Sequence, residues 1–255
     1  MKLSVIIPAY NESQTITAAI NALKNQSFPR SEFEIIVVDN NSNDNTAEIA
    51  AIVGADKIVN EAKRGTNIAR QRGFQESIGE IVAFLDADST PPPNWLALIR
   101  QYLSIDGVAA VSGPFDYGFR GWKRIAAGLY THYVFRYMDR ILFFMFRRKA
   151  GVIIGGNFAA SRSAIQQIGG LPPLRFHGDD AAVAILISRM AGKVIFTPEL
   201  TILSSARRFE KEGLIRVTLE YAWSYFKVYF TKLNILSTTK DSEVDLVVRT
   251  MMRPN

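Results

Sequence analysis

Short, continuous apolar runs alternate along the first part of the chain with segments whose apolar residues recur every three to four positions. Such runs predict buried strands, and the longer repeat predicts helices with one buried face. We predict strands at residues 3–8, 34–39, 56–59, 80–85 and 108–113. Helices are predicted at residues 11–24 and 66–77. Another helix is predicted to begin at the capping-box-like segment 45–48, and a fourth has prolines 91–93 in its first turn and ends at residue 103.

The rest of the chain has a less regular pattern. A glycine-rich strand at residues 151–162 leads into another helix, a helix is predicted at 181–190, and a strand at 193–197. Residues 211–235 predict one helix, and 237–255 a polar tail. Buried strands separated by helices are typical of a mostly parallel sheet covered on both faces, so the predicted class is α/β.

Polar residues follow three of the predicted strands. The sequence Pro-Ala-Tyr-Asn-Glu at 8–12 follows the first, Asp39 ends the second, and Asp86-Ala87-Asp88 ends the fourth. In parallel sheets these strand ends share one edge, where ligands bind. This convergence predicts a binding site, in which Asp39 accepts from a ribose hydroxyl or a base N–H.

Asp86 and Asp88 lie two residues apart, so on extended backbone their side chains point to the same side. Two carboxylates this close repel each other unless a cation or hydrogen bonds offset the charge. Mg²⁺ or Mn²⁺ suits such a pair, held together with substrate phosphates. The alternative is a turn in which both residues cap backbone N–H groups.

Composition narrows the partners and the location. The chain has 48% hydrophobic residues, no cysteine and a formal net charge of +6. It can therefore bury a sizeable core, cannot use a thiolate, and favours acidic partners. Nucleic acid is not an expected partner, because the basic residues are dispersed and the acidic strand ends would repel phosphate.

The N-terminus does not resemble a signal peptide and no apolar run reaches membrane-spanning length. We therefore expect a cytoplasmic protein, with a peripheral position on the inner face of the cell membrane as an alternative.

The segments VIIPAYNE, VVDNNSNDNT, RGTNIARQRG, IVAFLDADS and GDD occur in the order seen in family 2 inverting glycosyltransferases, which have the GT-A fold. The chain resembles that family strongly over residues 3–115 and more loosely over 150–200. The resemblance implies a Rossmann-like, mostly parallel sheet in a catalytic domain at 1–205. Its nucleotide-sugar half would be 1–115 and its acceptor half 116–205, with a C-terminal amphipathic helix and tail at 206–255.

The resemblance also implies a site for a UDP- or GDP-sugar. The implied donor-binding residues are Pro8, Ala9, Tyr10, Glu12, Asp39, Arg70, Asp86, Ala87, Asp88, Arg207 and Arg208. Asp88 would ligate the metal, and Asp86 the ribose or the metal. Gln71 departs from the Asn of the family's motif, which changes the local hydrogen bonding beside Arg70. For Arg207 and Arg208 the alternative is a solvated surface pair.

Asp179 and Asp180 are the catalytic candidates. The resemblance implies that Asp180 is the base, but Asp179 stands in place of the family's Glu, and this shorter side chain leaves open which of the two acts. The alternative for this pair is a helix N-cap, a position that Asp favours. Gly155, Gly156 and Asn157 are predicted to let the backbone approach the acceptor, or to serve packing. His177 is a candidate acceptor contact or metal ligand beside the pair, although a lone His is more often neither.

Two segments carry surplus apolar surface: residues 122–148, where aromatic residues interleave with basic ones, and 213–231. Such faces suit a membrane surface with anionic headgroups, but they equally suit packing on each other or on a second subunit. A membrane surface would favour a lipid-linked acceptor.

The predicted function is a metal-dependent inverting, hexosyltransferase-type enzyme acting on a glycan or lipid-linked acceptor. The alternatives are a sugar-nucleotide nucleotidyltransferase, whose glycine-rich phosphate loop is missing after the first strand, and a non-catalytic GT-A-like binding protein, against which the intact carboxylates argue.

Overall fold

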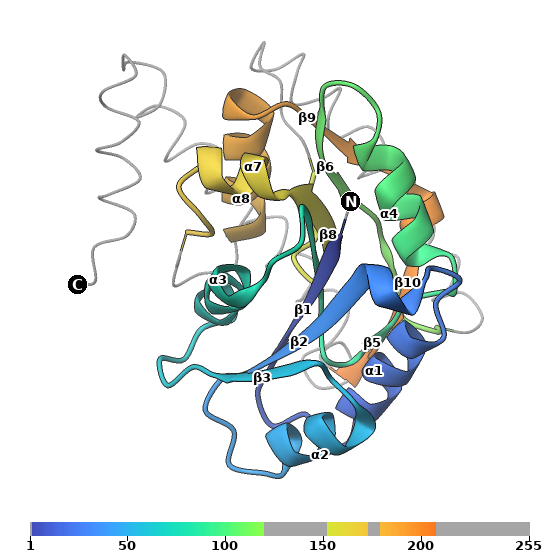
Figure 1. The fold of residues 1–255 in the computed structure, drawn as a ribbon, viewed down its shortest axis with the longest axis vertical. Helices are drawn as coiled ribbons and strands as arrows, with labels where there is room; N and C mark the ends of the chain where they lie inside the picture. The colour runs from blue at the N-terminus through green and yellow to red at the C-terminus, as the bar shows by residue number, and fades with distance from the viewer. Residues whose placement is uncertain (1, 120–151, 173–178, 208–255) are drawn as a thin grey trace.

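The computed structural model describes residues 2–119, 152–172 and 179–207. A seven-stranded sheet in the order β3-β2-β1-β4-β8-β6-β9 forms its centre (Figure 1). Its strands are β1 (Leu3–Ala9), β2 (Phe33–Asp39), β3 (Lys57–Asn60), β4 (Ile81–Leu85), β6 (Val108–Ser112), β8 (Asn157–Ser161) and β9 (Lys193–Phe196). β8 is antiparallel to β4 and β6, whereas the other neighbouring strands are parallel. The predicted α/β class with a mostly parallel sheet is confirmed.

Helices cover both faces of the sheet (Figure 1). On one face lie α1 (Ile16–Lys24), α2 (Thr46–Val53) and α4 (Trp95–Leu103), and on the other α3 (Thr66–Glu76), α7 (Arg162–Gln167) and α8 (Asp179–Met190). β1 shows why both faces are apolar: Val5 and Ile7 belong to the first core and Ile6 to the second. Strands buried on two sides need continuous apolar runs, which is the pattern along the sequence.

A second, three-stranded sheet lies beside the first, in the order β5 (Ser89–Thr90), β10 (Ile202–Ser204) and β7 (Phe115–Asp116). Two short 3₁₀ helices, η1 (Arg30–Glu32) and η3 (Pro198–Leu200), complete the described elements. The sequence analysis did not predict this small sheet, because two- and three-residue strands carry no periodicity. It matters for the site, because β5 directly follows Asp88 and β10 leads to Arg207.

Two predicted helix starts are wrong. The first helix begins at Ile16 instead of residue 11, because Asn11 has left-handed backbone (φ 54°) and residues 11–13 bond to the loop at 42–46. The helix predicted to contain prolines 91–93 begins only at Trp95, with Asn94 as its N-cap. Near residue 45, α2 begins as predicted, but Asn45 makes no side-chain cap bond, and Asp44 accepts from the N–H of Thr46 instead.

Asn157 joins several elements through buried polar contacts. Its Oδ1 accepts from Nε1 of Trp95 at 3.0 Å, and its Nδ2 donates to the carbonyls of Pro114 (3.2 Å) and Leu200 (2.7 Å). Only 1% of the residue is exposed. Its amide is thus engaged within the protein, a position that supports packing over side-chain contact with an acceptor.

Asn157→Ala is expected to lower the free energy of unfolding by about 3–5 kcal/mol, since it leaves a buried indole donor and two buried carbonyls without their partner. Denaturant unfolding measures the loss. Asn60→Ala, at an exposed end of β3, is the control and should change stability by less than about 0.5 kcal/mol. Equal stabilities of the two variants would contradict the role of Asn157.

Several predictions lie outside the described residues: the segment at 122–148, the helix at 211–235 with its stripe at 213–231, and the tail at 237–255. The domain limits at 115 and 205 stay predictions, although β8, from the second half, lies within the sheet of the first half. The helices within the described ranges include none with the length and hydropathy that a membrane span requires.

Candidate active site

The carboxyl ends of β1, β2 and β4 form one edge of the sheet, and the first residues of β8 join it. Ala9 pairs with Asp39 at the ends of β1 and β2, and Leu85 pairs with Asn157. The antiparallel direction of β8 is what brings its N-terminal end to this edge. The N–H of Asp86 donates to the carbonyl of Gly156 at 3.2 Å, which fixes the backbone where β4 ends.

Arg70 lies at the centre of this edge and is only 5% exposed. Its Nη2 donates to Oδ1 of Asp86 at 3.1 Å, and its Nη1 lies 3.4 Å from Oδ1 of Asp180. Nη1 also donates to Oδ1 of Asn67 at 3.0 Å, one turn earlier on α3. One guanidinium thus joins the end of β4 to the first turn of α8, which the structure brings together although they are distant in sequence.

The electrostatics of this cluster follow from burial and charge. Burial of Arg70 opposes its charge, but the carboxylates of Asp86, Asp180 and Asp179 outweigh it and raise the pKa of the guanidinium. Burial raises the pKa of Asp86, the negative charges of Asp88 and Asp180 raise it further, and Arg70 acts in the opposite direction. Asp86 is therefore a carboxylate for which a nearby cation stabilises the ionised form.

Gly155 and Gly156 let the carboxylates approach the backbone closely. A Cβ at Gly155 would overlap Oδ1 of Asp180, and one at Gly156 would overlap the carboxylate of Asp86. The N–H of Gly155 donates to Oδ2 of Asp180 at 2.9 Å. These glycines were predicted to approach an acceptor, which is untested. In the described structure they make room for Asp86 and Asp180.

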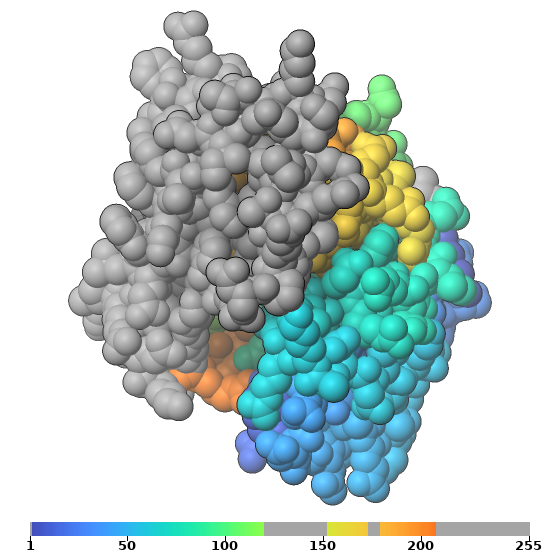
Figure 2. All heavy atoms as spheres, turned by 90° about the vertical axis from the view of Figure 1, so that its left-hand side faces the viewer, coloured from blue at the N-terminus to red at the C-terminus, as the bar shows by residue number. Residues whose placement is uncertain are grey.

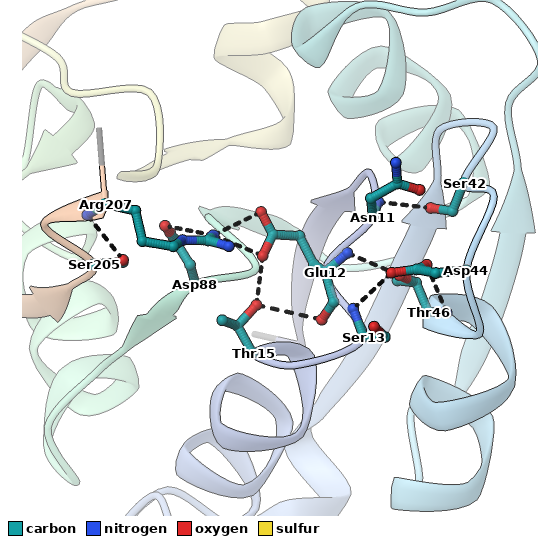
Figure 3. Close-up of polar contacts among 10 residues, drawn as sticks. All are labelled: Asn11, Glu12, Ser13, Thr15, Ser42, Asp44, Thr46, Asp88, Ser205 and Arg207. Carbon is teal, nitrogen blue, oxygen red and sulfur yellow. Dashed lines mark hydrogen bonds and ion pairs between the residues drawn. The ribbon is translucent and has the colours of Figure 1, made fainter. Parts of the chain in front are cut away.

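A second charged cluster lies where β1 and β4 end. Nη2 of Arg207 is 2.8 and 2.7 Å from the two carboxylate oxygens of Glu12 and 3.1 Å from Oδ2 of Asp88 (Figure 3). Burial opposes the charge of Arg207, but hydrogen bonds to Glu12 and Asp88 outweigh this and raise its pKa. Arg207, predicted as a donor contact, thus lies against the carboxylate predicted to hold the metal.

The loops after β1 and β2 are tied together beside this cluster (Figure 3). The N–H of Asn11 donates to Oγ of Ser42 at 3.0 Å, and that of Glu12 donates to Oγ1 of Thr46 at 2.9 Å. Asp44 accepts from the N–H of Ser13 at 3.3 Å and from both the N–H and hydroxyl of Thr46. The Asn-rich run is therefore a structured loop that supports Glu12.

The hydroxyl of Thr46 is the main cause that lowers the pKa of Asp44 to about 2 from 3.8. Because the folded-state pKa is depressed, this carboxylate stabilises the fold above pH 4, and the stabilisation disappears as the pH falls from about 4 to about 2. Asp44→Asn should remove that part of the acid dependence of unfolding. NMR titration of the Asp44 carboxyl checks the pKa, and a midpoint near 3.8 would contradict the contact.

Asp39 has a free buried acceptor. Its Oδ2 accepts weakly from the N–H of Ser42 (3.4 Å), while its Oδ1 has no hydrogen-bond partner among the described residues. Buried polar oxygens without a partner are rare and suggest a missing ligand. Tyr10 directly follows Ala9, which pairs with Asp39 across β1 and β2. The guanidinium of Arg64, which the sequence analysis missed, lies 4.4 Å from the centre of the exposed Tyr10 ring.

Gln71, the departure from the family's Asn, has a defined partner. Its Oε1 accepts from the N–H of Leu171 at 2.8 Å, and Nδ2 of Asn67 donates to the carbonyl of Pro172 at 3.0 Å. Figure 2 shows α3 (teal) and the α7 region (yellow) side by side on one face. Asn67 and Gln71 lie one helical turn apart on α3, and this spacing could have suggested that both bind the same segment at 171–172.

The remaining predicted residues are placed as follows. Ala9 and Ala87 are buried, Pro8 and Glu12 are half-buried, and Asp179 and Asp180 form the first turn of α8. His177 and Arg208 lie outside the described residues.

No group of three or more His, Asp or Glu side chains that could hold a metal occurs within the described ranges. Asp86 and Asp88 nevertheless fit a hard cation bound jointly with phosphates, because both present carboxylate oxygens already opposed by a guanidinium.

Comparison with known proteins places the chain in a family. Residues 4–169 match the profile of glycosyl transferase family 2. Glycosyltransferase AglE of Haloferax volcanii is 38% identical over 46% of this chain and 40% of its own. The GalNAc(5)-diNAcBac-PP-undecaprenol beta-1,3-glucosyltransferase of Campylobacter jejuni is 33% identical over 44% of this chain and 37% of its own.

The fold has solved counterparts. Mannosyltransferase PcManGT from Pyrobaculum calidifontis, in complex with GDP-Man and Mn²⁺, superimposes with a TM-score of 0.66 at 20% identity, covering 98% of this chain and 79% of that one. At this identity the similarity concerns the fold. The match spans about two fifths of the length of the two curated relatives. Because the family profile covers more than half of the chain, the protein belongs to glycosyl transferase family 2.

Proposed function

We propose that the protein is a metal-dependent inverting glycosyltransferase that moves a sugar from a nucleoside diphosphate to an acceptor hydroxyl or phosphate. The observation that carries the proposal is the position of Arg70, which brings Asp86 within 3.1 Å and Asp180 within 3.4 Å of one guanidinium. Donor-side and base-side carboxylates are thereby joined at one sheet edge. Family membership supports the reaction class.

The proposed donor site lies at the ends of β1, β2 and β4. Asp39 would accept from the ribose or base through its free Oδ1, and Tyr10, which follows the strand partner of Asp39, offers an exposed ring. Asp88, with Asp86, would hold Mg²⁺ or Mn²⁺, which when bound stabilises negative charge on the leaving diphosphate. The Mn²⁺ and GDP-Man bound by the Pyrobaculum enzyme support this choice.

Asp180 is the proposed general base. It would take the proton of the acceptor hydroxyl as that oxygen attacks the anomeric carbon, while the nucleoside diphosphate leaves from the opposite face. Its Oδ2 accepts from the N–H of Gly155 and its Oδ1 faces Arg70, so the carboxylate is held on two sides.

A lipid-linked or envelope glycan is the proposed acceptor class. The Campylobacter relative is named for an undecaprenol-linked saccharide, which supports this class. Peripheral contact with the inner face of a membrane and a homodimer stay predictions, because the segments on which they rest lie outside the described residues. The cytoplasmic location also stays a prediction.

A thermal-shift panel of nucleotide sugars with Mg²⁺ and Mn²⁺ tests the proposal. The correct donor at about 100 times its Kd should stabilise the fold by about 2.7 kcal/mol, which raises Tm by roughly 5–10 °C for a chain of this size. The shift should need the metal and should name the nucleotide and sugar. A panel in which no nucleotide sugar shifts Tm would contradict the donor site.

A further inference from the structure

The guanidinium of Arg207 bridges carboxylates from two different loops (Figure 3). Its Nη2 lies 2.8 and 2.7 Å from Oε1 and Oε2 of Glu12, and 3.1 Å from Oδ2 of Asp88. That nitrogen carries two hydrogens, so three oxygens share them and the contacts cannot all be full hydrogen bonds. The contact to Asp88 is the longest of the three and is therefore the one released most readily.

Glu12 is held in place by other neighbours. Its N–H donates to Oγ1 of Thr46 at 2.9 Å, and its Oε2 accepts from Oγ1 of Thr15 at 2.6 Å. The side chain of Arg207 is 50% exposed, whereas that of Glu12 is 20% exposed. The carboxylate is thus the fixed member of this pair, and the guanidinium is the member that can change partners.

The charges favour an exchange. A divalent cation at Asp88 would lie beside the guanidinium of Arg207, and the two positive charges repel each other. A diphosphate offers the guanidinium new anionic oxygens, which Arg binds with the same fork geometry as a carboxylate. Every charge stays paired when metal and diphosphate arrive together, but guanidinium and metal compete when the metal arrives alone.

We propose that Arg207 is a displaceable internal cation at Asp88, and that Glu12 is the positioning residue that keeps the released guanidinium beside the diphosphate. The proposal rests on the proposed function, since it takes Asp88 as a metal ligand. The proposal predicts that binding at the donor site is coupled: the metal binds weakly alone and more strongly together with a nucleoside diphosphate.

Binding of Mn²⁺ without nucleotide tests the exchange, measured on the full chain from the EPR signal of the free ion. Arg207→Met removes the competing charge and should strengthen Mn²⁺ binding about fivefold, the size expected for a partly exposed ion pair. Arg207→Lys should lie between wild type and Arg207→Met. Glu12→Gln removes the competing carboxylate, so that Asp88 is the remaining carboxylate partner of Arg207 within this cluster. Arg207 then pairs more strongly with Asp88, and Mn²⁺ binding should weaken. Because Arg207→Met and Glu12→Gln should change the Mn²⁺ affinity in opposite directions, a loss of stability common to both variants cannot explain the result.

Arg72→Met is the matched control. It removes a similarly exposed guanidinium from an ion pair with Glu76 (2.9 Å) on α3, and the Mn²⁺ affinity should not change. Equal affinities of wild type and Arg207→Met, or undetectable binding by both, overturn the exchange. Asp88→Asn separates the failures: if it loses Mn²⁺ while Arg207→Met has no effect, only the exchange fails. If Asp88→Asn binds Mn²⁺ as wild type does, the metal site fails and the exchange with it.

Discussion

Replacement of Asp180 by Asn is expected to lower the rate of sugar transfer about 10³-fold while donor affinity changes little. An amide cannot take the proton of the attacking hydroxyl. It also keeps only one acceptor oxygen, where Asp180 now uses Oδ1 toward Arg70 and Oδ2 toward the N–H of Gly155. Single-turnover transfer with the donor found by thermal shift measures the loss, and a separate donor titration shows that binding survives.

Asp179→Asn is the control for that experiment, because it removes a carboxylate from the same first turn of α8. This variant should retain most of the transfer rate, which would also resolve which of the two neighbouring Asp residues is the base. A near-wild-type rate for Asp180→Asn would exclude it as the base. Loss of donor binding in both variants would instead indicate a structural defect.

Replacement of Asp88 by Asn is expected to abolish the metal-dependent part of donor affinity and to reduce transfer by a hundredfold or more. The neutral amide is a poor ligand for a hard cation, and it also removes a charge that opposes Arg207. Donor titrations in Mn²⁺ and in EDTA measure the effect: wild type should differ between the two conditions, and the variant should not.

Asp106→Asn removes an exposed carboxylate from the α4–β6 connection and serves as the control for charge alone. It should respond to Mn²⁺ as wild type does. Donor affinity that still rises with Mn²⁺ in Asp88→Asn would exclude Asp88 as a metal ligand, whatever happens to the rate.

The main sheet was predictable because its signal is local. Each parallel strand is buried on both faces, so its apolar run appears in sequence, and the polar residues after β1, β2 and β4 mark the edge where they meet. The direction of β8 and the strands of the small sheet were not predictable, since pairing partners and two-residue strands leave no periodic pattern.

The contacts within the candidate site also depend on distant residues. The motif could suggest that Arg70 faces a nucleotide. It could not show that the Arg70 guanidinium would join Asp86 to Asp180, which lies 110 positions from Arg70 in the sequence. The pairing of Glu12 with Arg207 spans 195 positions. Such partners follow only from the folded chain, whereas the residue types themselves were visible from motifs.

β8 also has a consequence for the order in which the protein folds. The strand that completes the centre of the sheet is made long after β4, and the Trp95–Asn157 contact that anchors it spans 62 positions. Until then a growing chain exposes the hydrogen-bonding edge of β4, which is open to pairing with other chains. Residues 157–161 close that edge, and Gly156 just before them binds the N–H of Asp86, so a nascent chain gains part of its candidate site and its protection from aggregation together.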